Sequence, residues 1–140
     1  MPSHPSTADT AFKTAFEAGT IPPAEFHHRE HIQLAYVYLC EGQLEQAHQN
    51  MRAALQNFLS TNGVPADKYH ETLTLSWIQA VRHFMDRAGP TASFADFINA
   101  DDRLLDSKIM LSHYSQAHLF SDAARKSFVA PDLSPIPAPL

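Results

Sequence analysis

The stretch DKYHETLTLSWIQAVRHFMDRAGP, residues 67–90, indicates the fold class of this chain. Its apolar side chains recur every three or four positions, which is the spacing of one face of an α-helix. Asp67 follows Pro65 and can cap the start of this helix, and Gly89 with Pro90 ends it. The apolar face consists of Leu73, Trp77, Val81, Phe84 and Met85. We therefore predict that this segment forms the central core helix of an all-α protein.

Helical spacing continues on both sides of this segment. Towards the N-terminus it predicts one helix capped by Thr7 or Asp9 and ended by Gly19, a second over about residues 26–41 and a third over about residues 43–61. Shorter helices are predicted to start after Ser93, after Asp106 or Ser107, after Ser115 and after Ser121. The alternation typical of β-strands is absent. Residues 1–140 are thus expected to form a single-domain, irregular bundle of about five to seven helices.

The two ends of the chain differ from the middle in composition. Residues 1–8 read as a polar leader. Residues 131–140, PDLSPIPAPL, contain four prolines and predict an extended tail, because proline cannot continue a helix. Leu133 and Ile136 suggest that part of this tail lies against the body of the protein.

Composition excludes several classes of partner. Ten Lys and Arg against 15 Asp and Glu give a formal charge of −5, so we expect no nucleic-acid partner. The longest apolar run, residues 34–40, is too short to span a membrane, and the first ten residues do not resemble a signal peptide. The single cysteine, Cys40, fits a reducing cytoplasm. The sequence leaves the oligomeric state open, and a homo-oligomer is compatible with it.

Nine histidines are the main lead to function, and helical periodicity sorts them by face. On the second predicted helix, His28 and His31 share a face with Ile32, and His27 lies one position round. His27 or His28 can therefore pair with His31 at the spacing that brings two ligands to one metal.

The start of the central helix repeats this arrangement. His70 shares a face with Trp77 and Val81, and Glu71 follows it directly. Glu71 can serve as a carboxylate ligand, as a base, or as the partner that orients an imidazole. His113, at the end of a short apolar helix, is a fourth candidate.

The same periodicity assigns other histidines to solvent. His48 groups with Arg52 on the polar side of its helix, and His83 groups with Arg87. His4 and His118 lie in segments without a usable pattern.

The first functional hypothesis is a mononuclear metal site where the second helix and the central helix begin. His28, His31 and His70 would bind the metal, with Glu71, His27 or His113 completing the shell or positioning a small-molecule substrate. Such nitrogen-rich ligation suits Zn, Fe(II), Ni or Cu(II). A cofactor-free variant of this site has His70 as the general base and Glu71 orienting it. The sequence leaves open whether the protein is an enzyme.

Two named metal patterns do not fit. His70-Glu71 begins like the HExxH motif of zinc proteases, but Thr74 stands where the second histidine belongs. Two Glu-x-x-His pairs occur, as a di-iron bundle requires, but the second ends at His48 on the solvent side.

The second hypothesis is a non-catalytic helical module that binds a protein or an apolar small molecule. Nine Phe, four Tyr, four Met and one Trp provide adaptable apolar surface for such a role. Metal content and the behaviour of His-to-Ala variants separate the two hypotheses.

Three segments together resemble an uncharacterised family of small all-helical bacterial proteins. They are FHHREH at residues 26–31, KYHET at residues 68–72 and PDLSPIP at residues 131–137. The resemblance extends over most of the chain and implies no activity, cofactor or catalytic residue.

Overall fold

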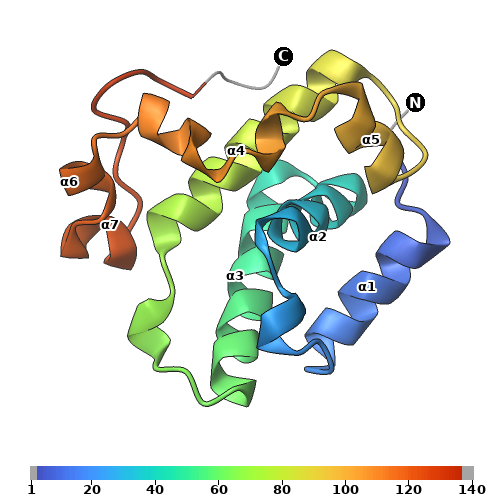
Figure 1. The fold of residues 1–140 in the computed structure, drawn as a ribbon, viewed down its shortest axis with the longest axis horizontal. Coiled ribbons are helices and arrows are strands. Elements are labelled where there is room, and N and C mark those ends of the chain that lie inside the picture. The colour runs from blue at the N-terminus through green and yellow to red at the C-terminus, as the bar shows by residue number, and fades with distance from the viewer. Residues whose placement is uncertain (1–2, 137–140) are drawn as a thin grey trace.

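The computed structural model describes residues 3–136, which form seven α-helices and four 3-10 helices without a β-strand (Figure 1). The α-helices are α1 (Thr7–Glu17), α2 (His28–Glu41), α3 (Leu44–Thr61), α4 (Glu71–Ala88), α5 (Phe94–Ala100), α6 (Gln116–Leu119) and α7 (Asp122–Lys126). The 3-10 helices are η1 (Pro23–Glu25), η2 (Ala66–Lys68), η3 (Arg103–Leu105) and η4 (Ser107–Ser112). The prediction of an all-α irregular bundle is confirmed.

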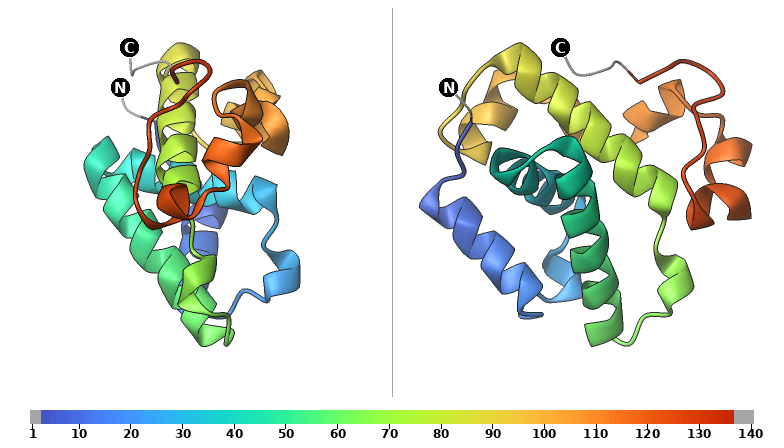
Figure 2. Two further views of the ribbon diagram at one scale, coloured as in Figure 1. Left: turned by 90° about the vertical axis from the view of Figure 1, so that its left-hand side faces the viewer. Right: turned by 180° about the vertical axis from the view of Figure 1, so that it is seen from behind.

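The centre of the bundle is formed by α2, α3 and α4, each of which packs against the other two. Helix α1 covers α2 and α3 on one side, and α7 packs against α4 on the other, so that α1 and α7 lie at opposite ends of the molecule (Figures 1 and 2). Residues 34–39 of α2 are buried without interruption. None of the helices within residues 3–136 combines the length and apolar character needed to cross a membrane.

The start of α1 is fixed by a buried carboxylate. Ser6 rather than Thr7 or Asp9 is the N-cap, and its hydroxyl accepts a hydrogen bond from the Asp9 amide (3.0 Å). The Asp9 carboxylate in turn accepts hydrogen bonds from the amides of Ser6 (2.9 Å) and Phe94 (2.8 Å) and from the Gln33 side chain (2.9 Å). Thr7 and Ala8, the last two residues of the predicted leader, belong to the first turn of α1.

The central helix begins later than its sequence predicts. Pro65 and Asp67 belong to the turn of η2, and α4 starts at Glu71 with His70 as its N-cap. The His70 Nδ1 accepts a hydrogen bond from the Leu73 amide (3.1 Å), which satisfies one of the free amides of the first turn. Here an imidazole takes the place of the Ser or Asp side chain that usually caps a helix.

Residues 127–136, which we call the C-terminal segment, follow α7 without helical structure. The buried Thr72 hydroxyl donates to the Ser127 carbonyl (3.0 Å) and accepts from the Val129 amide (3.1 Å). Tyr114 donates its hydroxyl to the Val129 carbonyl (2.6 Å), and His113 Nδ1 lies 2.9 Å from the carbonyl oxygen of Ser134. These contacts bind the segment to the body, as predicted for the tail, whose last four residues lie outside the described range.

The two residues proposed to anchor this tail behave differently. Ile136 packs against the hydrophobic core, whereas Leu133 is 59% exposed. The anchoring role is therefore confirmed for Ile136 and wrong for Leu133.

Candidate functional site

Two hollows border the connection between α3 and α4, and Tyr69 lines both. The first, the apolar pocket, has a volume of about 220 Å³. It is lined by Phe26, His31, Leu55, Phe58, Leu59, Lys68, Tyr69, His70, Leu73 and Thr74. The second, the polar cavity, has a volume of about 650 Å³. It is lined by Arg52, Gln56, Ala66, Asp67, Tyr69, Glu71, Asp122, Arg125 and Lys126.

A cluster of stacked rings shapes the apolar pocket. Phe58 of α3 lies 4.9 Å from Phe16 of α1 and 5.2 Å from Phe26, measured between ring centroids. Phe26 precedes α2 and also stacks on His31, at 5.6 Å. The apolar stripes of α1 and α3 thus meet the turn before α2, and His31 is held against this aromatic wall.

The His31 imidazole is the least satisfied polar group of the apolar pocket. Its Nε2 is buried and has no hydrogen-bond partner among residues 3–136. Burial, supported by the charge of the neighbouring His28, lowers the pKa of His31 to about 4. The ring is therefore neutral at pH 7. An unpartnered buried polar atom of this kind costs about 1–3 kcal/mol in folding free energy.

His70 lines the same pocket, but both of its ring nitrogens are engaged. Nδ1 accepts from the Leu73 amide, so Nε2 carries the proton and donates to the Leu119 carbonyl (2.8 Å). Burial lowers the pKa of His70, and the positive charge of Arg125 adds to this effect. His70 thus fixes the start of α4 as a neutral ring, with its edge towards Phe120.

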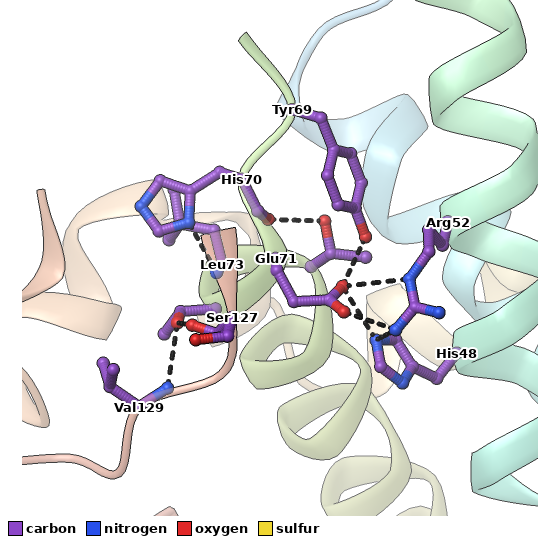
Figure 3. Close-up of polar contacts among 10 residues, drawn as sticks. His48, Arg52, Tyr69, His70, Glu71, Leu73, Ser127 and Val129 are labelled. Carbon is purple, nitrogen blue, oxygen red and sulfur yellow. Dashed lines mark hydrogen bonds and ion pairs between the residues drawn. The ribbon is translucent and has the colours of Figure 1, made fainter. Parts of the chain in front are cut away.

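Beside the apolar pocket, three side chains converge on the carboxylate of Glu71 (Figure 3). Tyr69 donates its hydroxyl to Oε1 (2.6 Å), and His48 donates from Nε2 to the same oxygen (3.1 Å). Arg52 donates from Nε to Oε1 (3.3 Å) and from Nη2 to Oε2. The His70 ring points away from this group, and among the described residues it shares no hydrogen bond with Glu71 (Figure 3).

The electrostatics of this group favour an ionised carboxylate. Burial alone would raise the pKa of Glu71, but the hydrogen bonds from Arg52, Tyr69 and His48 hold it below its ordinary value. Burial and the bond to Glu71 raise the pKa of Tyr69 to about 12, so its hydroxyl stays protonated and keeps donating. The network therefore locks the Tyr69 ring in place as a wall of the apolar pocket.

The structure divides the predicted site residues among several environments. His31 and His70 line one pocket, and His28 is close enough for its charge to affect His31. The His28 Nε2 lies 2.8 Å from the Leu104 carbonyl oxygen, and its ring meets Trp77 edge-on.

The other three predicted residues do not join this pair. His27 is exposed and contacts Glu30, whereas His113 contacts the C-terminal segment. Glu71 lines the polar cavity. Within residues 3–136, no group of three or more His, Cys, Asp or Glu side chains is arranged to hold a metal ion.

Two histidines assigned to solvent are partly buried. The His48 side chain is only 14% exposed, because the residues that enter α4 fold across the polar flank of α3. His83 lies beside Phe84, and its Nδ1 is buried without a hydrogen-bond partner among the described residues. Periodicity within one helix cannot show such coverage, because the covering residues belong to another element.

Acid should reveal the burial of His31. An unfolded chain takes up a proton on this residue near pH 6.5, whereas the folded protein does so only near pH 4. The stabilising contribution is thus complete above about pH 6.5 and is lost as the pH falls towards 4. We expect the unfolding free energy to drop between pH 7 and pH 4.5 by about 2 kcal/mol more in the native protein than in His31→Leu.

Urea unfolding at the two pH values measures this difference. His4→Leu, at an exposed position, serves as the matched control and should follow the native protein. Equal losses in the native protein and in His31→Leu would show that His31 titrates normally in the folded state.

Comparison of the chain with protein-family models, with curated proteins and with solved structures finds no match. In line with the resemblance of the three short segments, which implies no activity, no function transfers from a relative.

Proposed function

We propose that the protein binds a small, mainly apolar molecule in the apolar pocket, with one hydrogen bond to His31. The buried Nε2 without a partner is the observation that carries this proposal. A ligand with one hydrogen-bonding group at this depth would relieve the cost of that atom. Concave apolar sites with a few convergent polar groups are typical of small-molecule binding.

The size of the pocket limits the ligand. An apolar cavity of about 150 Å³ is enough to bind benzene. At about 220 Å³, the apolar pocket has room for one ring with a short substituent. The walls of Phe26, Phe58 and Leu73 suit an aromatic or branched aliphatic body.

Binding is favoured over base catalysis by the properties of the two imidazoles. A group with a pKa of about 4 accepts a hydrogen bond at pH 7 but has little tendency to accept a proton. Both nitrogens of His70 are held by backbone groups. The catalytic pair of His70 and Glu71 remains a prediction without a shared hydrogen bond to support it.

The metal site of His28, His31 and His70 also remains a prediction. His31 has a nitrogen available, but His28 and His70 each direct Nε2 to a backbone carbonyl. A metal bound at these nitrogens would have to replace both contacts. Elemental analysis of untagged protein, alongside His31→Ala, tests this reading directly. If the native protein contains a stoichiometric metal and the variant does not, the partner of His31 is that metal and not the proposed ligand.

Two neutral probes test the proposed function. We expect 2-phenylethanol to bind the native protein, with amide shifts in two-dimensional NMR spectra around residues 26–31 and 68–74. His31→Leu should weaken it about tenfold, which is the value of one hydrogen bond, because leucine keeps the volume and removes the acceptor. Toluene, which has no hydroxyl group, should bind both proteins equally.

The control variant is His27→Leu, which should bind both probes as the native protein does. If neither probe binds at millimolar concentration, the pocket does not have this function. If 2-phenylethanol binds His31→Leu as tightly as it binds the native protein, the hydrogen bond to His31 does not contribute to ligand binding.

A further inference from the structure

The polar atoms that line the apolar pocket indicate which chemical class of ligand it binds. This inference rests on the proposed function. Five polar side chains line the apolar pocket, and three of them are engaged within the protein. Tyr69 donates to Glu71, His70 uses both ring nitrogens, and the Thr74 hydroxyl donates to the His70 carbonyl (2.8 Å). Only His31 and Lys68 retain polar atoms without a partner in residues 3–136.

These two residues differ in their exposure. His31 lines the pocket and its Nε2 is buried, whereas Lys68 is exposed and therefore lies at the rim. The Lys68 ammonium has no ion pair or hydrogen bond with the rest of the described chain, although its neighbour Asp67 is acidic. Asp67 lines the polar cavity instead.

The charged lining of the apolar pocket is positive, although the carboxylate of Glu71, which is paired with Arg52, lies beside it. Lys68 is the single charged residue that lines it, and no carboxylate lines it. Arg125 adds positive potential from the neighbouring cavity, as its effect on His70 shows. An ammonium ligand would meet repulsion here, whereas an anion would meet an unpaired cation at the point where the pocket opens to solvent.

We infer that the ligand is a small carboxylic acid whose ring or branched chain fills the apolar pocket and whose carboxylate pairs with Lys68. The body of the ligand reaches inwards and forms the proposed hydrogen bond with His31 through one polar group. The carboxylate remains at the rim, where water still solvates it. This arrangement avoids burying a carboxylate in an apolar site, which would be costly without full pairing.

Phenylacetate and its neutral counterpart phenylacetamide form the matched probe pair. We expect the native protein to bind phenylacetate three- to fivefold more tightly at low salt, as is typical of an ion pair near solvent. Lys68→Met should abolish this preference by weakening the binding of phenylacetate. Lys126→Met, which removes a cation from the polar cavity, should retain the preference. In 0.5 M NaCl the preference should shrink, because salt screens an exposed pair.

The outcomes separate this inference from the proposed function. If phenylacetamide binds as tightly as phenylacetate, or if Lys68→Met keeps the preference for the acid, the carboxylate inference is wrong and the pocket still binds apolar molecules. If no probe binds, including 2-phenylethanol, the proposed function fails and this inference fails with it.

Discussion

Replacing Phe58 with alanine is expected to lower the free energy of unfolding by about 3–5 kcal/mol, the range found for buried aromatic residues. Phe58 is only 8% exposed and packs against the rings of Phe16 and Phe26, which also contact each other. Its removal would leave a cavity that joins the apolar pocket, because helices packed on three sides cannot collapse to fill it. Chemical denaturation followed by circular dichroism measures the loss.

Phe128→Ala provides the control, because Phe128 is 38% exposed. This variant should lose only about 1 kcal/mol, since less apolar surface leaves water at that position. Benzene should restore part of the stability of Phe58→Ala by occupying the enlarged pocket. A loss below about 1.5 kcal/mol for Phe58→Ala would mean that this ring does not support the pocket.

Replacing Glu71 with alanine should destabilise the protein by about 2–3 kcal/mol at pH 7. The change leaves His48, the Tyr69 hydroxyl and Arg52 without their common acceptor. Breaking a fully buried ion pair costs about 3–5 kcal/mol, and partial exposure of Arg52 (39%) reduces the figure here. Urea unfolding at pH 7 measures the effect.

The two control variants are Asp67→Ala and Glu71→Gln. Asp67 also lines the polar cavity but is exposed and has no ion pair among the described residues, so its removal should change stability by less than about 0.5 kcal/mol. Glu71→Gln keeps the volume and should fall between the other two. Because Tyr69 depends on Glu71 for its position, Glu71→Ala should also weaken the binding of 2-phenylethanol. If Glu71→Ala is as stable as the native protein and binds 2-phenylethanol as tightly, the hydrogen bonds to Glu71 do not support the pocket.

The helices could be predicted because their signals are local. Apolar spacing placed α3 and α4, and glycines with positive φ at residues 63 and 89 end or follow them. The faces of α2 and α4 predicted that His31 and His70 would point to one site, and both residues line the apolar pocket. Both residues are near the starts of their helices, and these two starts border the same pocket.

The polar side of the site could not be predicted in this way. Tyr69 and Lys68 lie in the connection between α3 and α4, where no periodicity indicates a direction. His48 and Arg52 are polar residues on a polar face, and only the path of that connection makes them partners of Glu71. The start of α4 was also placed too early, because histidine is an unusual cap.

Thr72 places a narrow constraint on the evolution of this chain. The buried Thr72 hydroxyl donates to the carbonyl of Ser127 and at the same time accepts from the amide of Val129. Among the genetically encoded side chains of this size, only serine can repeat both roles, since valine has the shape of threonine but neither polar function. Ser127, Val129 and Ser134 of the C-terminal segment contact the body through their backbone, so substitution at these positions can be gradual. Position 72, by contrast, accepts almost no other residue. The place of Ser127 in the structure therefore depends on a residue 55 positions away in sequence.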